Sequence, residues 1–82
     1  MVTIEYTSSF KKQFSKIKDK TFKIRIIKLI EKIIENPLIG KPMRNLRKGT
    51  RQVHIKPYRL AYSYLEDELV IIFLEIYHKD DQ

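Results

Sequence analysis

Hydrophobic residues follow two different periods in the first part of the chain. In residues 2–6 apolar and polar side chains alternate, which predicts a half-buried strand. Phe10, Phe14 and Ile17 are instead spaced by four and three residues, so they form one stripe along a helix. The Thr-Ser-Ser run at residues 7–9 supplies a candidate N-cap for that helix. The chain is therefore expected to begin with a strand and a short helix.

A second, longer helix is predicted over residues 21–36. Its apolar side chains fall on one face, and lysine and glutamate occupy the other. The helix is expected to end at Asn36, because Pro37 disfavours helical backbone in the residue before it. The buried face is expected to consist of Phe22, Ile26, Leu29, Ile30, Ile33 and Ile34.

The prolines and glycines of residues 37–50 predict a loop. Three strand-like runs follow this loop. Residues 51–56 and 59–65 alternate between apolar and polar side chains. Residues 69–77 are almost continuously apolar, which is typical of a central strand covered on both faces. The acidic residues 66–68 are expected to form the turn between the last two strands.

The predicted element order is β-α-α-β-β-β. This order indicates an α+β domain in which a two-helix hairpin packs on one face of a small, mainly antiparallel twisted sheet. The chain has 82 residues, which suits a single domain spanning residues 1–82.

Composition removes several classes of protein from consideration. The chain contains no cysteine, which excludes a disulfide scaffold, a thiolate zinc site and a cysteine nucleophile. No apolar run reaches the roughly 18–20 residues that span a bilayer. The first residues lack the basic and apolar regions of a signal peptide. We therefore expect a cytoplasmic protein that does not bind membranes.

The charge is distributed unevenly along the chain, whose formal net charge is +7. Residues 41–65 contain seven lysines and arginines and no acidic residue, whereas residues 66–82 contain six acidic residues and one lysine. A basic segment of this length favours a polyanionic partner, nucleic acid above all. The cations of this segment expected to bind phosphate are Arg44, Arg47, Lys48, Arg51 and Lys56.

The two alternating strands predict one polar and cationic face. If Pro57 and Tyr58 form a two-residue turn, Lys56 lies directly opposite Arg59. Like charges placed opposite each other destabilise a sheet, so this pair calls for an anion. The face is expected to consist of Gln52, His54, Lys56, Arg59, Ala61 and Ser63.

Glu75 is the one acidic residue inside the last apolar run. A three-residue loop at residues 66–68 would place Glu75 and Tyr77 on the same face as Arg59. A two-residue loop would bury the carboxylate without a partner, which is costly. We therefore expect the three-residue loop, with Glu75 and Tyr77 supporting a site around Arg59.

His54 and His78 are the only histidines, and each lies near arginine or lysine. Imidazole side chains can exchange protons near neutral pH, so both are candidates for acid–base catalysis. Their spacing from Glu75 matches no metal-binding motif, and the surrounding cations oppose metal binding. We expect neither a metal nor another cofactor.

Several segments together resemble the RelE/ParE superfamily of type II toxin–antitoxin toxins. The clearest segment is residues 49–62, followed by an acidic turn and an apolar strand that ends in Tyr77-His78. The run Tyr58-Arg59-Leu60-x-Tyr62 is its most specific part. The segment that begins at His54, and the terminal histidine, are most similar to the YafQ-type branch, and the final Tyr-His pair is also similar to the YoeB branch. The similarity extends over essentially the whole chain and implies a RelE-like fold.

The resemblance implies a ribosome-dependent, metal-independent endoribonuclease that cleaves mRNA and inhibits translation. In that reaction the ribose 2′-OH attacks the adjacent phosphate, which requires a base, an acid and a cation at the phosphate. Arg59 matches the family's phosphate-binding arginine, His54 lies where relatives carry lysine or histidine, and His78 matches a terminal histidine. Lys79 matches an RNA-binding arginine of RelE when the sequences are aligned without a gap.

The resemblance also implies partners. We expect a cognate acidic antitoxin, the ribosome and mRNA, and a toxin that is monomeric alone and hetero-oligomeric with its antitoxin. The basic outer surface of the two helices is the expected docking site for the antitoxin. Two alternatives stay open: a ParE-like inhibitor of DNA gyrase, and a catalytically degenerate binding module.

Overall fold

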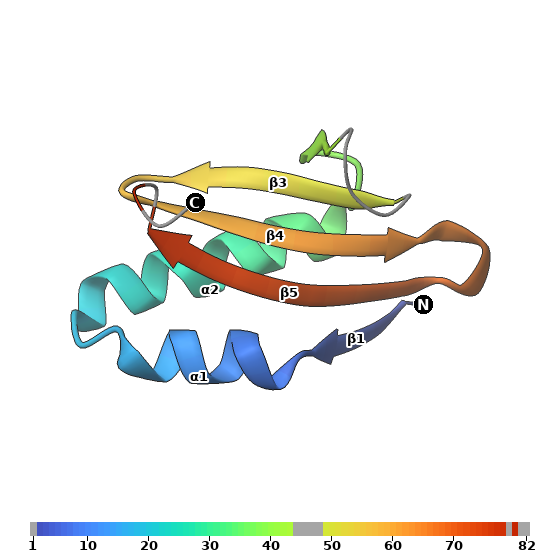
Figure 1. Ribbon diagram of the computed structural model, residues 1–82. Coiled ribbons are helices and arrows are strands. Elements are labelled where there is room, and N and C mark those ends of the chain that lie inside the picture. The colour runs from blue at the N-terminus through green and yellow to red at the C-terminus, as the bar shows by residue number, and fades with distance from the viewer. Residues whose placement is uncertain (1, 44–48, 79, 81–82) are drawn as a thin grey trace.

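The computed structural model describes residues 2–43, 49–78 and 80. It has the predicted order of two helices and four main strands, with a two-residue strand added inside the region expected to be a loop (Figure 1). The α+β fold class is therefore confirmed. The elements are β1 (Thr3–Tyr6), α1 (Ser8–Lys16), α2 (Lys20–Glu35), β2 (Lys41–Pro42), β3 (Thr50–Ile55), β4 (Tyr58–Leu65), the 3₁₀ turn η1 (Glu66–Glu68) and β5 (Val70–His78).

Both helices begin at a side-chain cap. The Thr7 hydroxyl accepts a hydrogen bond from the Phe10 amide at 3.0 Å, and the Asp19 carboxylate accepts one from the Phe22 amide at 3.2 Å. These caps satisfy amide groups that have no partner within the first turn of a helix. The second helix stops before Asn36, as the following proline predicts.

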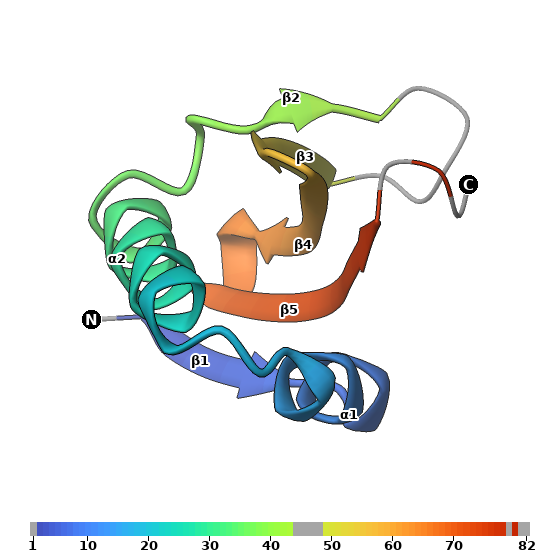
Figure 2. The ribbon, with the colours of Figure 1, turned by 90° about the vertical axis from the view of Figure 1, so that its left-hand side faces the viewer.

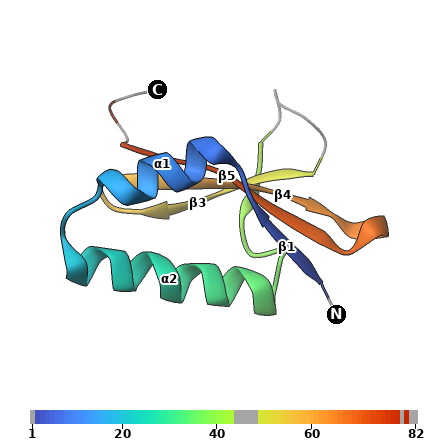
Figure 3. The same ribbon diagram turned by 90° about the horizontal axis from the view of Figure 1, so that it is seen from below.

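The sheet is mixed, with the strand order β1-β5-β4-β3-β2. β1 runs parallel to β5, and the other neighbours are antiparallel. Seen along the strands, α2 lies on one side of the twisted sheet (Figure 2). α1 continues the direction of β1 and lies beside β5, so only α2 crosses the face of the sheet (Figure 3).

The hairpin between β3 and β4 differs from the prediction. His54 pairs with Arg59 and Ile55 with Tyr58, so Lys56 and Pro57 form the two-residue turn. The predicted pairing of Lys56 with Arg59 is wrong. Tyr58 belongs to β4 because its ring packs against Phe22 of α2, with ring centres 5.2 Å apart.

The turn between β4 and β5 also differs from the prediction. Leu65 pairs with Val70, so four residues form the loop instead of three. Between Ala61 and Tyr62 the register then shifts by one residue, and Leu74 is the extra residue on β5. This β-bulge restores the expected face. Glu75 therefore lies opposite Ala61, on the same face as Arg59.

One hydrophobic core joins the helices to one face of the sheet. Ile26 and Ile33 of α2 are fully buried against Leu60, Tyr62 and other strand residues. The predicted buried face of α2 is correct, with Leu29 and Ile34 half-buried at its margins. In the described part of the chain, no helix lies over the face of β3, β4 and β5 that points away from α2 (Figure 2). That face is the surface available for a ligand.

Candidate functional site

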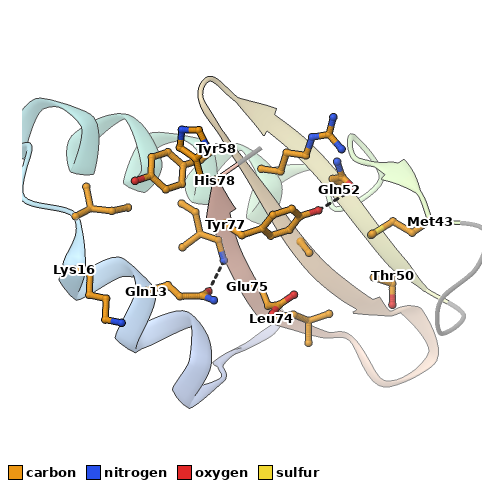
Figure 4. Close-up of a pocket in the computed structure, with 14 residues that line it drawn as sticks. Gln13, Lys16, Met43, Thr50, Gln52, Tyr58, Leu74, Glu75, Tyr77 and His78 are labelled. Atoms are coloured by element: carbon orange, nitrogen blue, oxygen red, sulfur yellow. Dashed lines mark hydrogen bonds between the residues drawn. The ribbon is translucent and has the colours of Figure 1, made fainter. Parts of the chain in front are cut away.

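An open hollow of about 680 Å³ lies beside β3, β4 and β5 and extends to the last turn of α1 (Figure 4). Arg59, Glu75, Tyr77 and His78 all line it. Four of the side chains that the sequence singled out therefore meet around one cavity.

Arg59 occupies the middle of this arrangement. It lies in β4 between His54 of β3 and Tyr77 of β5, which are its two direct cross-strand partners. Directly opposed residues in an antiparallel sheet have Cβ atoms about 4.5–5.5 Å apart. An anion bound at the guanidinium is therefore within reach of both neighbours.

A small residue in β4 makes room for a contact across the sheet. Ala61 has Gln52 on one side and Glu75 on the other. Over this position the Tyr77 hydroxyl donates a long hydrogen bond of 3.5 Å to the Gln52 side-chain oxygen. The contact links β3 to β5 and holds the Tyr77 ring beside Arg59.

His78 ends β5 and pairs with Tyr58, on the opposite face from Arg59. The edge of one ring meets the face of the other at 74°, with centres 5.4 Å apart. Nδ1 of His78 accepts a hydrogen bond from the Asp80 amide at 3.2 Å and lies 3.6 Å from the Asp80 carboxylate. Because Nδ1 acts as an acceptor, the neutral ring carries its proton on Nε2, the atom that can give a proton to a ligand.

His54 is placed differently from His78. It is exposed and shares the face of Arg59, yet it lines a second, smaller hollow against α2 and not the larger one. The two histidines are therefore not brought together in one cavity, and Arg59 lies between them in the register of the sheet.

Arg51 and Tyr62 together hold the loop that leads into β2. The Arg51 guanidinium donates to the carbonyl groups of Gly40 at 2.8 Å and Leu38 at 3.2 Å. The Tyr62 hydroxyl donates to the Pro37 carbonyl at 2.7 Å and accepts from the Gly40 amide at 3.0 Å. Arg51, expected to bind phosphate, thus points to the face opposite Arg59 and makes structural contacts there; its binding role stays a prediction.

Replacing Tyr62 with phenylalanine should destabilise the protein by about 1–3 kcal/mol, because a buried amide and a carbonyl lose their partner. Burial raises the pKa of the Tyr62 hydroxyl, although the Gly40 amide and the Arg51 charge oppose the rise. The raised pKa means that the folded protein favours the neutral Tyr62 hydroxyl. The stability that this hydroxyl contributes is therefore complete below pH about 10 and is lost as the pH rises through the folded-state pKa. Urea unfolding of Tyr62→Phe and the unmodified protein should therefore converge in alkaline solution. A pH-independent difference would contradict this account.

Two residues of α1 contribute to the site although no sequence pattern marks them. The Gln13 side-chain oxygen accepts a hydrogen bond from the Ile76 amide at 2.8 Å, next to the bulge. Lys16 adds a cation to the cavity (Figure 4). Gln13 and Lys16 reach the hollow because β1 pairs with β5 only as far as Phe73, and α1 lies beside the rest of β5.

The remaining cations predicted to bind RNA are not all placed. Arg44, Arg47, Lys48 and Lys79 lie outside the described residues. Lys56 is exposed in the turn between β3 and β4. The described parts of the chain contain no helix long and apolar enough to cross a membrane.

Fold and site together define a small basic α+β protein with an arginine-centred hollow on an uncovered sheet face. Residues 4–82 match the family model described as the ParE toxin of the parDE type II toxin–antitoxin system. The chain therefore belongs to this toxin family of type II toxin–antitoxin systems. No curated protein sequence is significantly similar to it.

Solved structures of RelE toxins have the same fold. The toxin chain of the intact E. coli RelBE toxin–antitoxin complex is 18% identical with a TM-score of 0.79, over 93% of this chain and 94% of that one. The Mycobacterium tuberculosis RelBE2 complex contains a chain that is 22% identical with a TM-score of 0.78, over 95% and 98% of the two chains. The isolated E. coli RelE toxin is 15% identical with a TM-score of 0.80, over 95% and 84%. At these identities the likeness shows the RelE-like fold that the sequence predicts.

Proposed function

We propose that this toxin is a ribosome-dependent endoribonuclease that cleaves mRNA in the cytoplasm. The observation that carries the proposal is the place of Arg59. It lies on the uncovered face near the start of β4, one strand away from each of His54 and Tyr77, and lines the same hollow as His78. A cation that lies beside His54 and lines the same hollow as His78 suits attack of a 2′-OH on the neighbouring phosphate, because both histidines can transfer protons.

Each side chain has a part in the proposed reaction. His54 takes the proton from the 2′-OH as its oxygen bonds to phosphorus. His78 gives the proton on Nε2 to the 5′-oxygen as the P–O bond breaks. Arg59 stabilises the additional negative charge on the phosphate during both steps. Glu75 and Tyr77 support the arginine, and no metal ion takes part.

In this proposal the ribosome positions the mRNA relative to the two histidines. His78 lies on the other face of the sheet from Arg59 and His54. One phosphate can meet groups from both faces only around the end of β5, where His78 lies, so the mRNA must be held in a bent path there. A ribosome that holds the mRNA can impose such a path. Correct orientation of the reacting groups alone accounts for a large part of catalysis.

An acidic antitoxin is the partner that the type II system implies. The solved relatives include toxins in complex with antitoxins. We propose that the antitoxin of this chain binds the basic outer surface of the two helices. Opposite charge chiefly accelerates such association.

The alternative is inhibition of DNA gyrase, which the ParE description of the matching family favours. Expression of the toxin in growing cells separates the two functions. If the proposal is right, incorporation of labelled amino acids stops first and DNA synthesis continues. Arrest of DNA synthesis and loss of supercoiling during normal translation would instead establish the gyrase function.

A further inference from the structure

A second hollow of about 370 Å³ lies between α2 and the end of β3. Five basic side chains line it and no acidic one does. They are Arg25, Lys28 and Lys32 of α2, His54 of β3, and Lys56 of the following turn.

The three cations of α2 form a row along the flank that faces β3. From Arg25 to Lys32 the helix rises about 10 Å. Lys28 and Lys32 are four residues apart, so their like charges face each other and destabilise the helix. An anion that binds between them removes this repulsion.

The second hollow begins where the first one ends. Arg59 lines the first hollow, and its direct partner His54 lines the second. β2 pairs only with Arg51 and Gln52, so within the described residues it leaves the edge of β3 beyond Gln52 uncovered. A chain of phosphates can therefore pass from one hollow to the other around this edge.

We propose that an RNA strand bound at Arg59 continues past His54 into this groove, where Arg25, Lys28 and Lys32 bind its phosphates. This inference extends the proposed function by assigning a binding surface outside the reaction centre. His54 lies at the junction and contacts the strand between the two hollows.

The lining favours RNA over an acidic peptide. Its two apolar members are Ile55, which is only 7% exposed, and Leu29, which packs against the core. Protein partners are usually anchored by apolar or aromatic side chains in a pocket. This groove offers little apolar surface for such an anchor, whereas a row of cations matches the regular charge of a phosphate backbone.

RNA binding at low salt tests the groove directly. Two labelled single strands are compared by fluorescence anisotropy, one of about four nucleotides that fills only the first hollow and one of about twelve that reaches the groove. Lys28→Ala/Lys32→Ala should weaken binding of the longer strand about tenfold and lower its salt slope by about 1.4, the value for two phosphate contacts. Binding of the shorter strand should not change.

Lys11→Ala/Lys12→Ala is the matched control, because it removes the same charge from exposed positions of α1. An equal loss in the control, or no detectable binding of either strand to the unmodified protein, would overturn the proposal. Unchanged RNA binding with loss of antitoxin capture would also overturn it and make the groove a peptide site. Binding is measured without cleavage, so an intact mRNA in a translation assay would refute the nuclease function while leaving this result unaffected.

Discussion

Arg59→Ala should reduce mRNA cleavage on the ribosome by about 10²–10³, the loss typical of removing one group that stabilises transition-state charge. This loss is expected because Arg59 lies between His54 and Tyr77 and is the one lysine or arginine that the described strands contribute to the lining of the hollow. The rate is measured by primer extension on a defined mRNA in a reconstituted translation mixture.

Two controls separate lost chemistry from lost structure. Arg59→Lys keeps the charge but cannot form two parallel hydrogen bonds with a phosphate, so its activity should fall between those of the alanine variant and the unmodified toxin. Thermal unfolding followed by circular dichroism shows whether each variant is folded. If folded Arg59→Ala cleaves at the normal rate, Arg59 is not part of the reaction centre.

His78→Gln should lower the cleavage rate by about 10²–10⁴, the usual contribution of a general acid or base. Glutamine can still accept a hydrogen bond from the Asp80 amide, but it cannot deliver a proton to the leaving oxygen. Binding of the variant to ribosomes, measured by co-sedimentation, should remain normal because glutamine, like a neutral imidazole, carries no charge and the net charge of +7 is kept.

Asp80→Ala is the matched control for His78. It removes the carboxylate that lies 3.6 Å from Nδ1 but keeps the backbone amide that donates to the ring. The effect of this variant should be much smaller than that of His78→Gln. If both variants lose the same activity, His78 serves to hold the chain end and not to transfer a proton.

The alternation of side chains was sufficient to predict which residues share a face of the sheet. Gln52, His54, Arg59 and Ala61 lie together, as expected, although the register of the hairpin differs. The observed register differs from the predicted one by two residues. Such a shift changes the cross-strand partner of every residue but leaves each side chain on the same face of the sheet. Lys56 and Pro57 form the turn because Tyr58 packs on Phe22 of α2 and so belongs to β4. No local pattern in the sequence reveals this contact with a distant helix.

Glu75 illustrates how a correct placement can follow from an incorrect loop. Avoiding a buried, unpaired carboxylate correctly predicts its face, and the chain achieves this with a longer loop and a bulge at Leu74. The bulge is held from outside the sheet by Gln13 of α1. The contacts of Arg51 with the loop before β2 likewise arise from tertiary packing, so charge alone could not separate this arginine from its neighbours.

The chemical form of the cut ends tests the central claim most directly. Attack by the 2′-OH leaves a 2′,3′-cyclic phosphate on one fragment and a 5′-hydroxyl on the other. Purified toxin should therefore produce these ends in mRNA only when ribosomes are present, and Arg59→Ala should not. Intact mRNA in the complete translation mixture, or fragments with 5′-phosphate ends, would contradict the proposed endoribonuclease.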